Sequence, residues 1–226
     1  MNRFGFNDIE TIEKVFKFCE KTQNISICSV FTHYYNAKCE KSAESQFLKF
    51  LKIKDFVGSN FYKNDIIFHI ANSDGLALKN KLDMVRVGIK TYTDKMFQTV
   101  TLKSKIIEFQ NLEVGDTAGY SSVFRASYKT KLAVVAIGYA DGIFRNIVGR
   151  GYVLIKGNFA KIVAVCMDSI LVDVTNINCK LYDDAVLIGK SEDKQIFVCD
   201  VARWCDTIDY EILTKISKRV KRKYIF

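Results

Sequence analysis

The pattern of apolar residues changes near residue 95, and this change limits the possible folds more than any other feature of the chain. Before it, amphipathic segments at 9–19 and about 42–56, and a short helical segment at 76–79, alternate with apolar, β-branched runs at 25–31, 66–70 and 84–89. Apolar residues at three- and four-residue spacing predict helices, whereas the short apolar runs predict buried strands. Strands that alternate with helices predict a parallel sheet.

After residue 95 the predicted strands follow one another without helices between them. They cover residues 100–109, 132–137, 152–155, 160–165, 170–174, 185–188 and 195–198, and one helix is predicted at 210–216. Turn signals such as Lys156-Gly157-Asn158 separate the strands. We therefore expect an α/β part followed by a mostly antiparallel all-β domain, with the boundary between residues 1–95 and 96–226.

The composition excludes several classes of protein. The chain has 226 residues, of which 49% are hydrophobic, so it can bury a sizeable core. No apolar run approaches the roughly 18 residues needed to cross a bilayer, and the first residues do not resemble a secretion signal. Seven cysteines occur without any Cys-x-x-Cys pair, which predicts reduced thiols and no metal site. We expect a cytoplasmic protein with no membrane contact.

The formal charge of +9 raises the question of nucleic-acid binding. Much of the excess lies near the C-terminus, in Lys215, Lys218, Arg219, Lys221, Arg222 and Lys223. These residues alternate with apolar ones up to Phe226, a pattern that fits an edge strand as well as a phosphate-binding patch. No helix-turn-helix, zinc-finger or RNA-recognition signature accompanies them. A basic nucleic-acid-binding module stays as an alternative function, although the sequence does not favour it.

Ten short strings, spread in order along nearly the whole chain, carry more specific information. They are 1–5 (MNRFG), 32–33 (TH), 46–47 (QF), 69–73 (HIANS), 84–89 (MVRVGI), 119–120 (GY), 138–142 (GYADG), 166–168 (CMD), 173–175 (DVT) and 210–211 (YE). In these strings the chain resembles the alanine racemases, isomerases that use pyridoxal 5'-phosphate to interconvert L- and D-alanine. The resemblance implies the last strands of a partial TIM-type barrel at 1–95, followed by the family's C-terminal β domain. It also implies a homodimer and a role in supplying D-alanine for the peptidoglycan of the cell wall.

The resemblance assigns a phosphate site to the first part of the chain. In a barrel, loops after the last strands commonly hold a phosphate with backbone N–H groups and a hydroxyl. Asn72 and Ser73 follow one predicted strand, and Gly88 and Ile89 follow the next. The family would use the Ser73 hydroxyl, the Gly88 and Ile89 amides and the Tyr210 phenol for the cofactor phosphate. The alternative for Ser73 is that it caps the helix that follows it.

Arg86 is the residue with the most specific implied chemistry. A guanidinium only donates hydrogen bonds and keeps its proton, so opposite a pyridine nitrogen it leaves that nitrogen unprotonated. In the family this arrangement is understood to limit electron withdrawal by the ring and to suppress side reactions. His69 would lie behind Arg86 and orient it. The apolar neighbours of Arg86 favour this interpretation over a surface ion pair.

Racemisation requires a base on each face of the alpha carbon. Family members use the cofactor lysine on one face and a tyrosine of the partner subunit on the other, and Tyr120 matches that tyrosine. A free phenol has a pKa near 10, so nearby hydrogen bonds and positive charge must stabilise its phenolate. Tyr139 and Met167 would line the same mouth and contact the substrate. The alternative for Tyr120 is an ordinary aromatic residue at a strand end.

The sequence also lacks parts of the family's site. The lysine that forms the Schiff base lies in a Lys-Ala-Asn-type loop, and no such string occurs here; about three of the eight barrel strands are present. Two hypotheses follow. Either the chain is the C-terminal part of an alanine racemase, completed by a companion chain that carries the N-terminal half, or it is a truncated fragment without catalysis.

Overall fold

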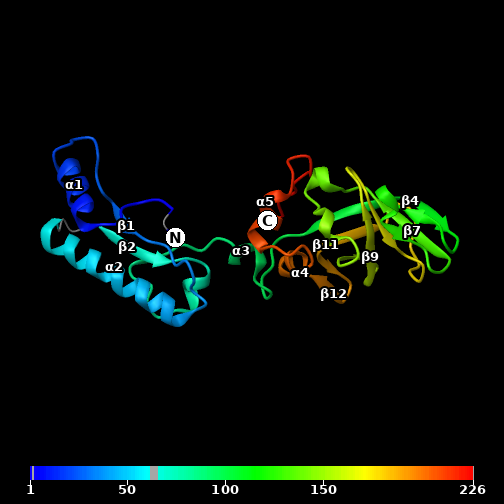
Figure 1. Cartoon of the computed structure of the whole chain (residues 1–226), viewed down its shortest axis with the longest axis horizontal. Coiled ribbons are helices and arrows are strands. Elements are labelled where there is room, and N and C mark those ends of the chain that lie inside the picture. The colour runs from blue at the N-terminus through cyan, green and yellow to red at the C-terminus, as the bar shows by residue number, and fades with distance from the viewer. Residues whose placement is uncertain (2, 62–65, 226) are drawn as a thin grey trace. The chain divides into compact units, whose positions relative to one another are not determined.

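The computed structural model describes residues 1, 3–61 and 66–225. Asn2, in the first of the ten strings, and Phe226, in the basic segment, lie outside the described residues. The chain divides into two compact units, residues 1–90 (unit 1) and 91–226 (unit 2), and each is described by itself (Figure 1). No helix among the described residues combines the length and the apolar character needed to cross a membrane.

Unit 1 contains a parallel sheet of the three strands β1 (Ser29–Phe31), β2 (Ile67–Ala71) and β3 (Met84–Val85), with β2 in the centre. Ser29 pairs with Ile67 and His69 pairs with Met84, so the three strands end at the same edge. The helices are α1 (Ile9–Glu20) and α2 (Glu40–Phe61), with the short segment η1 (Asp74–Ala77); the one-turn helix α3 (Lys90–Thr93) begins at the last residue of this unit. The predicted alternation of helices and parallel strands is confirmed.

The core of unit 1 lies on one face of this sheet. Phe68 and Ile70 of β2 pack with Phe16 of α1 and with Phe50 and Val57 of α2. Phe16 and Phe50 come from the amphipathic segments predicted at 9–19 and about 42–56, whereas Val57 lies just beyond the second one. The Asp8 carboxylate caps α1 by accepting the Thr11 N–H at 2.7 Å. On β1 and β2, Phe31 is 62% exposed and Ile67 43% exposed. The helices therefore bury the side of β2 that carries Phe68 and Ile70, and they leave Phe31 and Ile67 accessible.

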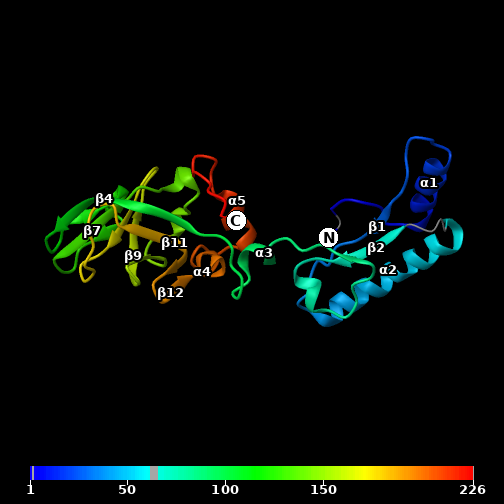
Figure 2. The same cartoon turned by 180° about the vertical axis from the view of Figure 1, so that it is seen from behind.

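Unit 2 is built on a seven-stranded sheet in which every pairing is antiparallel, as predicted. The strand order is β12-β11-β4-β7-β10-β9-β8, and a further pairing of Val186 with Leu154 joins β11 to β8. The sheet therefore closes on itself. The strands are β4 (Leu102–Leu112), β7 (Thr130–Val135), β8 (Tyr152–Ile155), β9 (Asn158–Val165), β10 (Ile170–Asp173), β11 (Asp184–Ser191) and β12 (Lys194–Ile196). Figure 2 shows these strands from behind.

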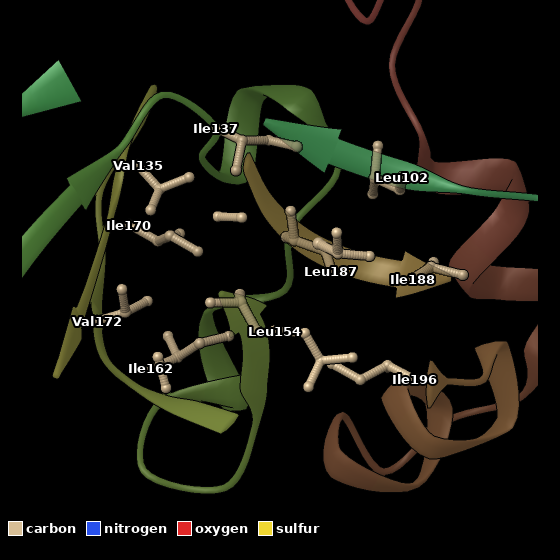
Figure 3. Packing of buried hydrophobic residues seen from close by; sticks show 14 of the residues in the cluster. Leu102, Val135, Ile137, Leu154, Ile162, Ile170, Val172, Leu187, Ile188 and Ile196 are labelled. Atoms are coloured by element: carbon tan, nitrogen blue, oxygen red, sulfur yellow. The ribbon is translucent and has the colours of Figure 1, made fainter. Parts of the chain in front are cut away.

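The interior of unit 2 is filled by aliphatic side chains from most of these strands. Leu102, Val135, Leu154, Ile170 and Leu187 belong to the same buried cluster, and Figure 3 shows how they converge. Burial does not simply alternate along these strands, since consecutive residues such as Val153, Leu154 and Ile155 of β8 all belong to the cluster. A two-stranded ribbon of β5 (Thr117–Ala118) and β6 (Phe124–Arg125), the turns η2 (Tyr120–Ser122), η3 (Tyr139–Asp141) and η4 (Arg145–Ile147), and the helices α4 (Val198–Trp204) and α5 (Asp209–Lys215) complete the unit.

Three local expectations were wrong. The run at 84–89 is a strand only over Met84–Val85; the Arg86 N–H still pairs with the Ala71 carbonyl, but the residues after it continue neither as strand nor as helix up to Lys90. The predicted strand at 195–198 ends at Ile196, and α4 begins two residues later. The basic segment at 216–225 contains no strand; its first residues instead hydrogen-bond to a turn of unit 2.

Candidate functional site

In unit 1 the predicted cofactor-binding residues collect at the carboxyl ends of the three parallel strands. His33 follows β1, Asn72 and Ser73 follow β2, and Arg86 follows β3. Because the strands are parallel, their ends meet at one edge of the sheet, which is where α/β folds usually bind ligands. The structure therefore brings Asn72, Ser73, Arg86 and Gly88 together with His69, which is the third residue of β2.

The Arg86 guanidinium is held from several sides. One amino group donates a hydrogen bond to His69 Nδ1, and the other donates to the Thr32 carbonyl at 2.8 Å and lies 3.2 Å from His33 Nδ1. The Phe31 ring lies 5.1 Å from the guanidinium carbon and stacks on His69 at 5.1 Å. These contacts fix both the position and the plane of the guanidinium.

Burial, together with the charge of Arg86, sets the state of the two histidines. Burial, and then the Arg86 charge, lower the pKa of His33 and of His69 from its ordinary value. Burial lowers the pKa of Arg86 too, but an arginine retains its proton in proteins. The site thus consists of one permanent cation beside two imidazoles that are neutral at pH 7, and His69 Nδ1 can accept a hydrogen bond from it.

Ser73 and Asn72 organise the loop after β2 in different ways. The Ser73 side chain makes no capping hydrogen bond to η1; its Oγ instead accepts the Gly88 N–H at 2.9 Å. The alternative in which Ser73 caps the following helix is therefore wrong. Asn72 restrains this turn, because its Oδ1 accepts the Gly75 N–H at 2.9 Å and its Nδ2 donates to the Tyr34 carbonyl at 3.2 Å.

These groups fit the donor set that pyridoxal phosphate would need. Two of the predicted phosphate donors, the buried Ser73 and the Gly88 amide, lie side by side next to Ile89; the Gly88 N–H is donated to Ser73 Oγ here and would exchange this acceptor for the phosphate. A Cβ built on Gly88 would meet no atom of the described residues within 4 Å, so there is room beside this amide. Arg86 adds a fixed cation on the adjoining strand. No group of three or more His, Cys, Asp or Glu side chains among the described residues is placed to hold a metal ion.

In unit 2 the Gly138–Gly142 motif forms a turn that binds the loop after β9. The Tyr139 N–H donates to the Cys166 carbonyl at 3.0 Å, and the Ala140 N–H donates to the Met167 carbonyl at 2.9 Å. A Cβ on Gly138 would lie 2.5 Å from the Cys166 carbonyl oxygen, so only glycine permits this approach. The structure therefore joins Tyr139 and Met167, the two predicted substrate-binding residues, and both side chains are exposed.

Tyr120 lies on a second turn that packs on the same strand. Gly119, at φ +76°, would place a Cβ 2.7 Å from the Ala164 Cβ of β9, and Ser121 and Ser122 also have positive φ. Tyr120 is 71% exposed and lines an open cleft of about 420 Å³ together with Val165 and Arg145. Gly119 thus packs against Ala164, three residues before Met167 in the sequence.

Tyr210 lies in the first turn of α5 and is 51% exposed. It belongs to unit 2, whereas the other predicted phosphate donors belong to unit 1. No role was predicted for His33 from the sequence, although it stands two residues after the apolar run 25–31 and is one of only two histidines in the chain. A polar residue at the end of a predicted parallel strand was the available signal.

Comparisons with known proteins agree with this description. The family model described as "Alanine racemase, N-terminal domain" matches residues 1–95, and the model for "Alanine racemase, C-terminal domain" matches residues 99–224. An alanine racemase of Thermodesulfovibrio yellowstonii is 34% identical over 233 residues, which cover 100% of this chain and 62% of that protein. The chain thus spans less than two thirds of the length of this relative.

Two solved structures are also similar. The alanine racemase of Bacillus anthracis with bound L-Ala-P has a TM-score of 0.86 and 28% identity, covering 97% of this chain and 61% of that chain. The alanine racemase of Bartonella henselae with covalently bound pyridoxal phosphate has a TM-score of 0.82 and 28% identity, covering 100% of this chain and 64% of that chain.

Proposed function

The chain belongs to the alanine racemase family, and from this premise we propose that it supplies one part of a pyridoxal-phosphate-dependent alanine racemase. The reaction would be the interconversion of L- and D-alanine. The observation that carries the proposal is the Arg86 guanidinium held by His69 and the Thr32 carbonyl, beside the Ser73–Gly88 pair at the same edge of the sheet. A permanent cation and phosphate donors at the ends of adjoining strands suit a phosphorylated pyridine.

The residues of unit 1 would bind and orient the cofactor. Ser73, Gly88 and Ile89 would donate to its phosphate, and Asn72 would keep their loop in place. Arg86 would face the pyridine nitrogen and, because it only donates, would keep a proton off that nitrogen. Pyridoxal phosphate, when bound, supplies a conjugated ring that makes the alpha C–H of an amino acid more acidic.

The residues of unit 2 would act on the substrate side. Tyr120 would take a proton from, or return it to, the alpha carbon, since its phenol stands at the mouth of an open cleft. Arg145 lines the same cleft. Tyr139 and Met167, joined through their turns, would contact the alanine, and Tyr210 would add its phenol to the phosphate donors.

The rest of the proposal concerns the assembly to which the chain would belong. We propose that the three parallel strands of unit 1 belong to a partial TIM-type barrel, and that the lysine for the opposite face comes from a segment carrying the remaining strands. A homodimer, in which Tyr120 serves the partner's site, is the arrangement that the family favours. A role in D-alanine supply for the cell wall is proposed on the same ground, and a cytoplasmic location stays a prediction.

The proposal is tested by reconstitution. The chain is co-expressed with the N-terminal barrel segment of the Thermodesulfovibrio yellowstonii relative, and D-alanine formed from L-alanine is measured. We expect pyridoxal-phosphate-dependent activity that falls by at least about 100-fold in Tyr120→Phe, the scale of lost acid–base catalysis. Tyr128→Phe is the matched control, because Tyr128 donates to Asp173 at 2.5 Å and has no role in the proposed site. A soluble pair without racemase activity would refute the proposal.

A further inference from the structure

Asp141, in the turn that carries Tyr139, is bonded to a part of the chain that the site described above does not include. Its Oδ2 accepts the Gly138 N–H at 2.9 Å and so fixes the start of the turn. Its Oδ1 lies 3.3 Å from Arg219 Nε, and its backbone carbonyl accepts the Ser217 N–H at 3.0 Å. Residues 217 and 219 thus hold both the side chain and the backbone of Asp141.

The segment from Lys215 to Val220 is itself well anchored. A Cβ on Gly142 would lie 2.3 Å from the Lys215 carbonyl oxygen, so the end of α5 packs directly on the turn. Ile216 and Val220 pack against the core of unit 2. Arg222 folds back and donates to the Ile216 carbonyl at 3.0 Å. An anchored segment can position another element, which a frayed terminus cannot.

The basic residues of this segment are not equivalent. Six of them lie between 215 and 223, with no acidic residue among them. Within the described part of the chain, Arg219 is the one that forms an ion pair, and its partner carboxylate is only 12% exposed. Lys218, its neighbour, forms none there. Arg219 therefore makes a specific ion pair with Asp141, which a surface that binds only through its net positive charge would not need.

We propose that Arg219 is a positioning residue for the substrate side of the site. Arg219 and the Ser217 amide hold Asp141, Asp141 fixes the Gly138–Gly142 turn, and the turn holds the loop of Met167 through the Tyr139 and Ala140 amides. The inference deepens the proposed function, on which the roles of Tyr139 and Met167 rest. The contacts themselves do not depend on it.

The proposal predicts a local effect when Arg219 is replaced. In Arg219→Gln the nearly buried Asp141 carboxylate loses its countercharge and keeps the Gly138 amide as a donor, so the turn opens more often. An ion pair with one exposed partner contributes little, so we expect amide hydrogen exchange at residues 139–142 to become about fivefold faster. Arg219→Lys restores the charge and should return exchange to near the wild-type rate.

Hydrogen exchange of the full chain, followed by mass spectrometry or NMR, tests this without requiring catalysis. Lys218→Gln is the matched control, since it removes the same charge one residue away. The fluorescence of Trp204, the single tryptophan, checks that each variant has the wild-type unfolding midpoint in urea. In the reconstituted enzyme, Arg219→Gln should raise KM for alanine more than it lowers kcat.

Each outcome decides the question. Faster exchange confined to residues 139–142 and 166–168, rescued by lysine and absent in Lys218→Gln, supports the positioning role. Unchanged exchange in Arg219→Gln, an equal effect in Lys218→Gln, or a uniform increase throughout unit 2 overturns it. If exchange changes as expected while the reconstituted protein has no racemase activity, the proposed function fails and the structural coupling stands.

Discussion

Replacing Gly138 by alanine adds one methyl group where the structure leaves no space for it. Gly138 has φ −143° and ψ −162°, an extended conformation that alanine adopts easily, so the backbone itself costs nothing. The new Cβ would, however, lie 2.5 Å from the Cys166 carbonyl oxygen and 2.5 Å from the carbonyl carbon and oxygen of Met167. All three are backbone atoms, which cannot rotate away as the end of a side chain could.

The expected loss of stability follows from these contacts. Overpacking of this kind costs about 2 kcal/mol. If the loop moves away to relieve it, the hydrogen bonds from Tyr139 and Ala140, of 3.0 and 2.9 Å, are lost at about 1 kcal/mol each. Either response costs about 2 kcal/mol, so we expect Gly138→Ala to lower the free energy of unfolding of unit 2 by about 2 kcal/mol.

Urea unfolding followed by tryptophan fluorescence measures this change in unit 2 alone. Trp204 is the only tryptophan and packs edge-on against Tyr152, with ring centroids 5.7 Å apart. With a slope of about 2 kcal/mol per molar urea, the midpoint should fall by about 1 M. Gly115→Ala is the control, because Gly115 has φ +94° and no described atom within 4 Å of its Cβ, so it costs only about 1 kcal/mol of backbone strain. A Gly138→Ala midpoint equal to that of wild type or of Gly115→Ala would refute the reasoning.

Two further predictions concern titratable groups. Because the pKa values of His33 and His69 are lowered in the folded state, the unfolded chain binds protons more readily. The free energy of unfolding of unit 1 should therefore be highest above about pH 6.5 and fall as the pH drops below it. Unfolding followed by circular dichroism of the helices should show that this free energy depends less on pH in His33→Gln and His69→Gln. Burial raises the pKa of Cys205 to about 11, so this thiol should react with a disulfide reagent only after unfolding. The exposed Cys28 and Cys39 should react within the dead time of mass-spectrometric labelling. Rapid labelling of Cys205 in the folded chain would contradict this prediction.

Much of the fold was predictable because its strands show simple patterns. Tyr152–Ile155 is a strand over the predicted residues, and the helix predicted at 210–216 is α5, Asp209–Lys215. Helix α4 was missed because its first residue, Val198, ends an apolar run that reads as a strand; the Asp200 carboxylate, which accepts the Phe197 N–H at 2.9 Å, starts the helix there. Strands of two residues, such as β5 and β6, are too short to show any period.

The site was predictable in its residues and in one of its contacts. The resemblance pointed to Ser73, Arg86 and the contact of Arg86 with His69, but the bond from Arg86 to the Thr32 carbonyl joins distant parts of the sequence and was not predicted. The bond from Gly88 to Ser73 forms where β3 has already ended, whereas a longer strand was predicted there. Likewise, the ion pair of Arg219 with Asp141 joins positions far apart in the chain, and the charge pattern alone fitted an edge strand as well as a phosphate-binding patch.

The central claim, that this chain supplies one of two bases of an alanine racemase, is tested most directly by exchange of the alpha hydrogen with solvent. The reconstituted protein is incubated with L-alanine or D-alanine in deuterium oxide, and deuterium at the alpha carbon is measured for each enantiomer. We predict that the wild-type assembly labels both enantiomers and interconverts them. Tyr120→Phe should abolish interconversion yet still label one enantiomer, because the base on the opposite face remains. The account would be contradicted if Tyr120→Phe labelled both enantiomers to the same extent as wild type. It would also be contradicted if a soluble wild-type assembly with bound cofactor labelled neither enantiomer.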